Sequence, residues 1–201
     1  MAAIPAHGVR EATVIVVVTL AVGEILVVAV PREIGDMNFK RIMRHLSCGP
    51  VTVRRTFSPS AFKAIERAIG ETETRHDGQI RFAVEAALDL SPLLAGQVAR
   101  ERAIEVFSQL RVWDTEHNNG VLIYLLLADR DVEIVADRGI HAKLGTETWE
   151  AICREMEAAF RNGQFEAGVL AGIHAVGDHL ARHFPPRSGK PNEMPDRPVV
   201  L

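Results

Sequence analysis

The chain has 201 residues, 47% of them hydrophobic, and 23 basic side chains stand against 26 acidic ones. This length suits one domain with a substantial apolar core. The near balance of charge lacks the excess of positive charge that a nucleic-acid-binding surface requires, so we expect no nucleic-acid partner. Cys48 and Cys153 form no CxxC pair, which excludes a disulfide framework and zinc-knuckle spacing.

Residues 12–30 form an apolar run, interrupted by two threonines and Glu24. Its length of about 19 residues reaches the range of roughly 17–25 that spans a bilayer, although a charged Glu24 would cost about 2.5–3.5 kcal/mol there. The basic residues after the run would leave the rest of the chain in the cytoplasm. Alternatively, the chain starts at Met37. Both interpretations give a cytoplasmic main domain, which is membrane-anchored if the first 36 residues are genuine.

The sequence divides into four segments. They are an N-terminal hydrophobic extension (1–36), a basic helix with a short strand (37–56), a main domain (57–184) and a proline-rich tail (185–201). The strand is expected at Val51–Arg55, where β-branched residues alternate with polar ones. The tail has few core-forming residues and is expected to be disordered.

Hydrophobic periodicity predicts helices and strands in the order β-α-β-α-β-β-α-α. After residue 56 the predicted elements are a helix from Ser58, a strand at 80–88, a helix from Ser91 to about Leu110, a hairpin at 121–137, a helix from Thr146 to Asn162 and a helix from about Phe165 to His183. Long helices between single apolar strands favour a mixed sheet that is covered on both faces.

Polar side chains lie at both ends of the predicted hairpin. Asp114 and Asn118 precede its first strand and Asp137 follows its second, whereas Asp129 and Asp131 lie at the turn. One site can therefore combine the first three but not the turn aspartates. Carboxylate and amide oxygens suit a hard cation such as calcium or magnesium. The same residues also suit an ordinary Asn-Gly turn with solvated acids, and both interpretations stay open.

Arg138 follows directly after Asp137. Its guanidinium can donate two parallel hydrogen bonds to a phosphate or another anion, or it can pair with a neighbouring acid such as Glu133. The nucleotide-binding motifs and the Gly-x-Ser-x-Gly motif are missing from the sequence. This lowers the odds of a nucleotide-binding protein or a serine hydrolase.

Two stretches carry a resemblance to a known family, NNGVLIYLLLADRDVEIVADRGI and FRNGQFEAGVLAGIHAV. From about Phe57 to Phe184 the chain resembles the TPM domain family. That family has an Asp-Asn-Gly triplet before its central strand, an arginine-bearing turn, a Gly-x-Gly at the end of the hairpin and a Phe-x-x-Gly element, which here runs from Phe160 to Leu170. Two positions depart from the pattern, since Asn118 replaces the aspartate and Asp137 replaces the first glycine.

The resemblance implies an α/β fold, a Rossmann-like α/β/α sandwich with a small mixed sheet of about four strands and four main helices. It also implies a divalent-cation site at the open end of the hairpin, held by Asp114, Asn118 and Asp137. Phosphatase activity is attributed to some plant members of the family, and maintenance or assembly of membrane complexes to others.

Two hypotheses for function follow. The first is a binding domain that recognises a protein partner, with a bound calcium or magnesium ion and with membrane association through residues 12–30. We prefer it because the sequence names no complete pair of nucleophile and base. The alternative is a cation-dependent phosphomonoester hydrolase, in which Asp114 and Asp137 act at the reaction centre and Arg138 holds the phosphate.

Overall fold

The computed structural model describes residues 13–19, 25–31, 36–187, 189 and 192–201. The chain divides into two compact units, Met1–Met43 and Arg44–Leu201. In the first unit, β1 (Thr13–Thr19) and β2 (Ile25–Pro31) pair as an antiparallel hairpin, because their valine, isoleucine and threonine residues favour extended backbone.

The membrane span expected at residues 12–30 lies partly outside the described residues. Its described parts are the two strands β1 and β2. Among the helices of the described part, none combines the length and the apolar character needed to cross a bilayer.

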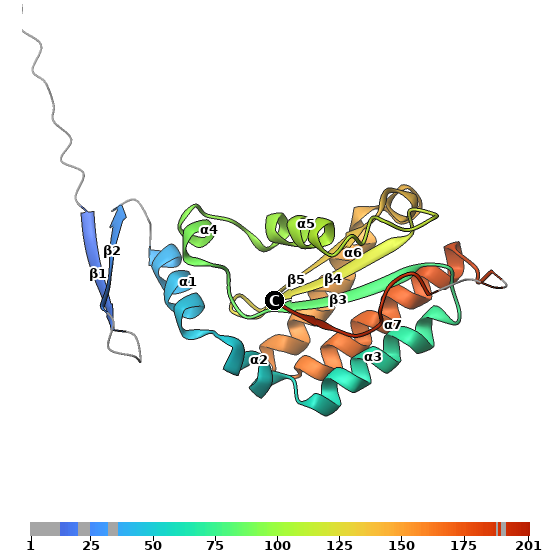
Figure 1. Cartoon of the computed structure of the whole chain (residues 1–201), viewed down its shortest axis with the longest axis horizontal. Helices are drawn as coiled ribbons and strands as arrows, with labels where there is room; N and C mark the ends of the chain where they lie inside the picture. Colours follow the sequence, from blue (N-terminus) through green and yellow to red (C-terminus); the bar gives the residue numbers. More distant parts are fainter. Residues whose placement is uncertain (1–12, 20–24, 32–35, 188, 190–191) are drawn as a thin grey trace, which may run out of the picture. The chain divides into compact units, whose positions relative to one another are not determined.

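The helix α1 (Asp36–Ser47) contains the division between the units in the sequence, and six helices and four strands follow it in the described part (Figure 1). These later elements are α2 (Pro50–Thr56), α3 (Pro59–Glu73), β3 (Gln79–Glu85), α4 (Leu90–Leu94), α5 (Ala99–Gln109), β4 (Gly120–Leu126), β5 (Asp131–Ala136), α6 (Arg138–Arg161), α7 (Phe165–His183) and β6 (Val199–Val200).

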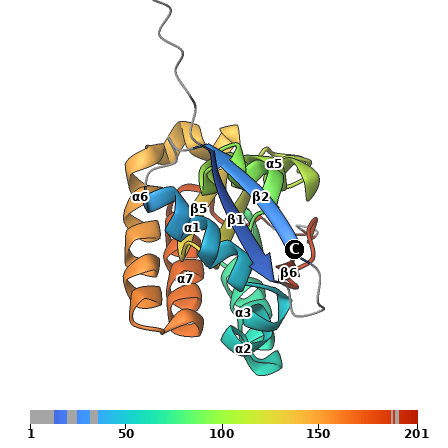
Figure 2. The same ribbon diagram turned by 90° about the vertical axis from the view of Figure 1, so that its left-hand side faces the viewer.

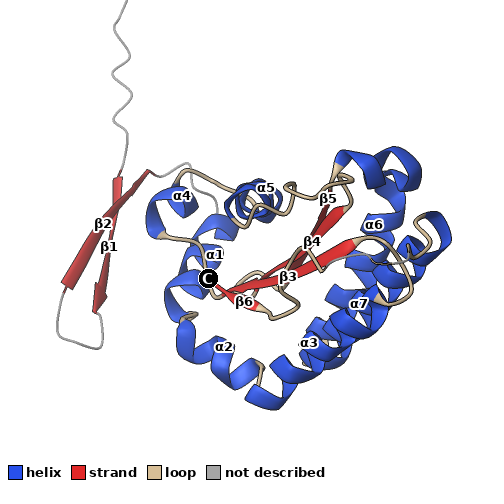
Figure 3. Ribbon diagram, turned by 45° about the vertical axis from the view of Figure 1, so that its right-hand side comes forward, coloured by secondary structure: helices blue, strands red, loops and turns tan. Residues whose placement is uncertain are grey.

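The second unit is built on a four-stranded mixed sheet with the strand order β5-β4-β3-β6. The central strand β3 runs parallel to β4 and β6, and β5 returns antiparallel to β4. The helices α3, α6 and α7 cover one face, and α5 lies on the other (Figures 1 and 3). The predicted α/β fold with a mixed sheet of four strands is confirmed, and the described part of the chain has seven helices where four main ones were expected.

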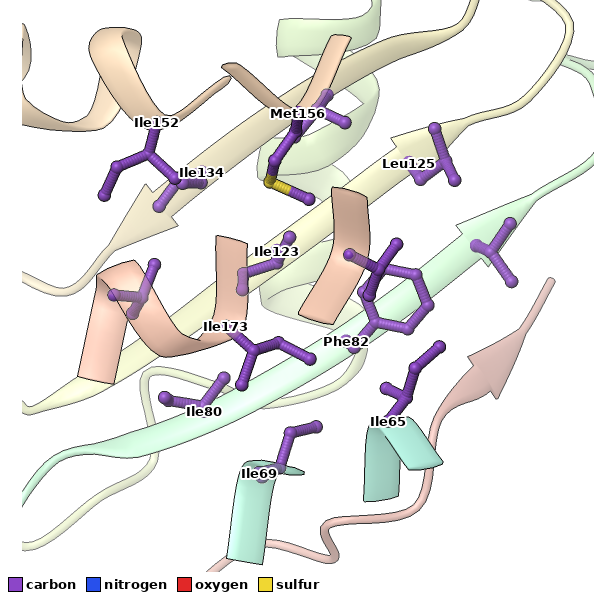
Figure 4. Packing of buried hydrophobic residues seen from close by; sticks show 14 of the residues in the cluster. Ile65, Ile69, Ile80, Phe82, Ile123, Leu125, Ile134, Ile152, Met156 and Ile173 are labelled. Carbon is purple, nitrogen blue, oxygen red and sulfur yellow. The ribbon is translucent and has the colours of Figure 1, made fainter. Parts of the chain in front are cut away.

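The main core lies between the sheet and the three helices on its first face. Alternate residues of the strands, among them Phe82 and Ile123, point toward α3, α6 and α7 (Figure 4). Ile65, Met156 and Ile173 meet them from the three helices, and all five side chains are at most 1% exposed. Burial of this apolar surface is the main stabilising contribution to the fold.

Two predictions of local structure differ from what is observed. The short strand expected at Val51–Arg55 is instead helix α2, because Pro50 takes the first helical position and Val53 and Phe57, four residues apart, both enter the core. The tail expected to be disordered instead contributes β6, whose residues pair with Ala83 and Val84 of β3.

Two helices also differ in their extent from the prediction. The single helix expected from Ser91 to Leu110 is two helices, α4 and α5, separated by Gly96 at φ 83°. The helix expected from Thr146 to Asn162 is confirmed as the second part of α6, which starts at Arg138 and is divided by Gly145, whose φ of 65° is non-helical. Positive φ is readily adopted by glycine and interrupts a helix.

A buried polar network lies on the α5 face of the sheet. The Tyr124 hydroxyl donates to Glu85 Oε2 at 2.6 Å, and Arg102 donates from Nε and Nη2 to the two oxygens of the same carboxylate at 2.9 and 3.0 Å. Burial and the neighbouring carboxylate raise the pKa of Tyr124 well above its ordinary value. The three side chains together tie α5 to β3 and β4.

The stability of the protein is expected to fall between pH 9 and pH 12. Burial raises the pKa of the Cys153 thiol from 9.0 to about 12, so the unfolded chain releases this proton at lower pH than the folded chain. The free energy of unfolding then falls with rising pH, by up to about 1.4 kcal/mol per pH unit for this group. Urea unfolding at several pH values measures the slope, and Cys153→Ala should reduce it. An unchanged slope in the variant would contradict the assignment.

Candidate functional site

Three strand ends meet at one edge of the sheet. The strands β3 and β4 run parallel and start level with each other, with Gln79 opposite Gly120. The strand β5 runs the other way and ends beside the start of β4. The residues just outside these ends, Asp77, Asn119 and Asp137, therefore gather at this edge, and we call them the strand-end cluster.

Hydrogen bonds fix the first two members of the cluster to each other. Asn119 Nδ2 donates to the Asp77 carbonyl at 2.7 Å and to Asp77 Oδ2 at 3.3 Å. The backbone N–H of Asn119 donates to Thr115 Oγ1 at 3.0 Å. These bonds hold the loop before β4 against the turn before β3.

The third member, Asp137, is the N-cap of α6. Its Oδ1 accepts from the Arg138 N–H at 2.6 Å, and its own N–H donates to the Gly120 carbonyl at 2.9 Å. A carboxylate at a helix N-terminus is favoured by the helix dipole. The residue that departs from the family's glycine therefore has a structural role as well as a position in the cluster.

Each member of the cluster carries one buried acceptor without a hydrogen-bond partner among the described residues. These atoms are Asp77 Oδ1, Asn119 Oδ1 and Asp137 Oδ2, in residues that are 6%, 1% and 9% exposed. Leaving such an atom unpaired costs about 1–3 kcal/mol, and in native proteins an ordered water or ion usually satisfies it. The edge thus offers three oxygens that need a donor or a cation.

Backbone oxygens lie close to this edge as well. A Cβ atom added to Gly139 would lie 2.5 Å from the Asn118 carbonyl oxygen and 3.1 Å from that of His117. The loop before β4 therefore rests directly on the first turn of α6. Asn118 itself adopts φ 50°, a left-handed conformation that asparagine tolerates better than most residues.

The C-terminal tail supplies a cation to the cluster. The Arg187 guanidinium hydrogen-bonds to the Asp77 carboxylate and contacts the imidazole of His117, and the bond to Asp77 raises the pKa of Arg187. Further along the tail, Glu193 accepts from the Glu116 N–H at 2.9 Å. The tail is therefore held beside the site by two of its residues, Arg187 and Glu193.

The residues predicted from the sequence are only partly brought together. Asp137 belongs to the strand-end cluster, whereas Asp114 is exposed and its carboxylate bonds to none of the other candidates in the described part. Asn118 directs its Oδ1 to Arg138, which donates from Nε at 3.1 Å and from Nη2 at 3.0 Å. The Arg138 guanidinium is thus hydrogen-bonded to the Asn118 amide oxygen.

The turn end of the hairpin is separate from this site. Asp131 pairs with Leu126 at the opposite end of β4. Asp129 is bound there by Arg44 at 2.9 Å and by His45 at 3.1 Å. The turn aspartates therefore lie far from the cluster, as the hairpin prediction required.

Sequence reasoning missed Asp77 and Arg187 and did not select Asn119. A usable signal was present for two of them, because Asp77-Gly78 and Asn119-Gly120 each stand at the start of a strand of the same parallel pair. Residues that precede neighbouring parallel strands lie at the same sheet edge. Arg187 gave no such signal, since its position depends on the path of the tail.

The side chains of the cluster are two carboxylates and one amide. In the described part of the chain, no group of three histidine, cysteine, aspartate or glutamate side chains is arranged to hold a metal ion. An ion at this edge would therefore need the Asn119 amide oxygen and backbone or water oxygens in addition to the two carboxylates.

The TPM domain family matches residues 52–179 of the chain, a segment that includes β3, the β4–β5 hairpin and the strand-end cluster. The protein belongs to the TPM domain family. The resemblance noted in the sequence is thereby confirmed. A search of curated proteins returned no match.

Two solved structures share the fold of this TPM domain. The NMR structure of the BA42 protein from the psychrophilic bacterium Bizionia argentinensis has 28% sequence identity and a TM-score of 0.62, over 72% of this chain and 95% of that one. The N-terminal domain of a protein from P. gingivalis has 18% identity and a TM-score of 0.53, over 64% of this chain and 78% of that one. The second likeness concerns the fold alone.

Proposed function

We propose that this TPM domain is a binding module that holds a calcium or magnesium ion at the strand-end cluster. The observation that carries the proposal is the set of three buried acceptors without donors, on Asp77, Asn119 and Asp137. Hard divalent cations prefer carboxylate, amide and carbonyl oxygens. One ion would satisfy all three acceptors at once and compensate the charge of Asp137, in addition to the Arg187 guanidinium that already pairs with Asp77.

The topology of the sheet supports this arrangement. Asp77 and Asp137 flank the start of β4 from the two neighbouring strands. Neighbouring strands lie about 4.8 Å apart, so the main chains at these two positions are separated by about 10 Å. Two carboxylate side chains can reach inward over that span to a shared ion. Asn119 lies between them, directly before the first residue of the intervening strand β4.

A binding role is favoured over hydrolysis because the described residues at the site include no free pair of nucleophile and base. General acid–base and nucleophilic catalysis need such groups within hydrogen-bond reach of each other. Asp137 caps α6, Arg138 is bound to Asn118, and Asp114 stands apart in the loop. A phosphatase built on these residues would first have to release Arg138 from Asn118.

The partner we propose is a protein that contacts the loop before β4. Exposed residues of this loop, Trp113, Asp114, Glu116 and His117, combine an aromatic ring with charged side chains. Aromatic residues are enriched at protein interfaces. A cation at the strand-end cluster would stiffen the loop from beneath and so lower the entropic cost of binding.

Calcium is expected to raise the melting temperature of the full chain, and Asp77→Asn and Asp137→Asn should abolish this shift. A ligand that binds only the folded state adds about 2.7 kcal/mol of stability at a hundredfold excess over its dissociation constant. Asp114→Asn is the matched control, since it removes the same charge from the same edge but outside the cluster.

The Asp114→Asn control distinguishes the strand-end cluster from the ligand set predicted from the sequence, which contains Asp114. A calcium shift that survives in Asp77→Asn but vanishes in Asp114→Asn would replace the cluster with the set predicted from the sequence. No shift in the unaltered protein at millimolar calcium or magnesium would remove the site. Hydrolysis of p-nitrophenyl phosphate that is lost in Asp137→Asn, with the fold intact, would instead favour the phosphatase.

Replacing Arg187 by glutamine is expected to raise the affinity for calcium roughly tenfold, which corresponds to about 1.4 kcal/mol. The guanidinium shares the Asp77 carboxylate with the proposed ion, and like charges at such close range repel each other. Calorimetric titration of the variant measures the change. Arg182→Gln, in α7, is the control, and an affinity lowered by Arg187→Gln would contradict the competition.

A further inference from the structure

A cavity is lined by residues of α2, α3 and the tail that forms β6. Figures 2 and 3 show where these three elements lie in the fold. Its volume is about 720 Å³, within the range of about 300–1,000 Å³ that is typical of ligand sites. The strand β6 is level with Ala83 and Val84 near the far end of β3. The cavity is therefore remote from the strand-end cluster and independent of the function proposed there.

The walls of this cavity are mainly apolar. Val53 and Phe57 form part of the lining and are themselves buried, at 2% and 1% exposure. Phe62 of α3 and Val200 of β6 extend the apolar lining toward solvent. Val200 is 51% exposed, so the cavity offers a hydrophobic lining that no residue of the described chain covers fully.

Three cations stand around this apolar lining. Arg54, Lys63 and Arg197 border the cavity, and Glu66 is the single acid among its described lining residues. None of the three cationic side chains forms an ion pair with a residue that the structure describes. This local excess of positive charge contrasts with the net charge of -3 of the whole chain. Charge complementarity selects an anionic ligand group at the rim.

We propose that this cavity binds an amphipathic anion, a molecule with a single apolar chain and a negatively charged head group such as a carboxylate. The apolar chain would lie against Phe57, Phe62 and Val200. The head group would remain at the rim, within reach of Arg54 and Lys63. Burial of the chain would supply most of the affinity, at about 0.8 kcal/mol for each methylene group removed from water, and the cations would select the head group.

The probe set separates the two parts of this recognition. Decanoate, decyltrimethylammonium and acetate are titrated into the full chain by calorimetry, all below their micelle concentrations. Decanoate has both the apolar chain and the negative head, and the other two each lack one of them. We expect decanoate to bind at least tenfold more tightly than decyltrimethylammonium, and acetate to give no measurable heat.

Two pairs of variants test the residues. Lys63→Glu should weaken decanoate binding at least tenfold, whereas Arg67→Glu should leave it unchanged, because Arg67 lies one turn further along α3 and does not line the cavity. Val200→Asp should also weaken binding. Its control is Ile104→Asp, in a side chain of α5 that is similarly exposed, at 49%.

Several results would overturn the proposal. Equal affinity for decanoate and decyltrimethylammonium would show that the cations do not select the ligand. Equal loss in Lys63→Glu and Arg67→Glu would show that binding is not at this cavity. Dimerisation of the unliganded protein that Val200→Asp abolishes, measured by analytical ultracentrifugation, would assign the apolar lining to a second copy of the chain. No heat with any probe would also contradict it.

Discussion

Replacing Arg102 by methionine is expected to lower the free energy of unfolding by about 3 kcal/mol. The substitution leaves the Glu85 carboxylate, whose side chain is 11% exposed, without the guanidinium that now binds both of its oxygens. Removing one partner of a buried ion pair costs about 3–5 kcal/mol, and the partial exposure of Arg102 places the cost at the lower end. Urea unfolding at pH 7 measures the loss.

An exposed ion pair provides the matched control. Arg154→Met removes an arginine that pairs with Glu150 across a 3.7 Å contact on the surface of α6, and surface pairs contribute about 0–1 kcal/mol. Equal effects of the two substitutions would show that burial does not strengthen the dependence of Glu85 on Arg102. They would also show that the hydrogen bonds among Tyr124, Glu85 and Arg102 do not stabilise the protein more than a surface ion pair does.

Gly120→Ala is expected to destabilise the protein by more than about 3 kcal/mol and to abolish calcium binding with it. A Cβ atom at this position would lie 2.0 Å from the Val112 carbonyl oxygen, which belongs to the backbone and has no rotamer to move into. Overpacking against rigid surroundings forces the backbone to shift. Because Gly120 follows Asn119 directly, such a shift would displace the strand-end cluster. Thermal unfolding with and without calcium measures both effects.

Gly49→Ala is the control for this prediction. Apart from its two chain neighbours, no described residue has an atom within 4 Å of a Cβ built on Gly49. The substitution should therefore change stability by at most about 1 kcal/mol, the usual cost at a helix N-cap. If Gly120→Ala melts at the same temperature as the unaltered chain, the close approach of the Val112 carbonyl to Gly120 is not maintained in solution.

Much of the fold was accessible from the sequence because several signals agreed. Ser58 accepts from the Ala61 N–H at 3.1 Å as the predicted N-cap of α3, and the antiparallel register of β4 and β5 bears out the hairpin. Caps and hydrophobic periods act locally, within one or two turns or strands. Such features are visible in a single sequence.

The missed elements depend on interactions across long sequence separations. Nothing in the composition of the tail indicates a strand, because β6 is specified by its pairing with Ala83 and Val84 more than a hundred residues earlier. In α2 the alternation of Val51 and Val53 suggested a strand, but the preceding proline and the burial of Phe57 favour a helix. Tertiary contacts override weak local preference at both places.

The site predicted from the sequence and the proposed strand-end cluster lie at the same edge of the sheet, but they share only Asp137. The hairpin alone placed Asp137 beside the start of β4, and this could be inferred from strand direction. Asp77 required the knowledge that β3 runs parallel to β4 and starts level with it. Asp114 was selected for its residue type, although the loop leaves it exposed. Spacing in the sequence did not show that Asp77, rather than Asp114, lies in the cluster.

Paramagnetic broadening by manganese tests the cation site most directly. Added below stoichiometry to the isotope-labelled chain, the ion broadens the amide signals of residues that lie close to it. We expect the signals at 77–79, 118–120 and 137–139 to vanish first and excess magnesium to restore them. Broadening centred on the turn at 129–131, or spread over exposed acids without a centre, would contradict a cation site at the strand-end cluster.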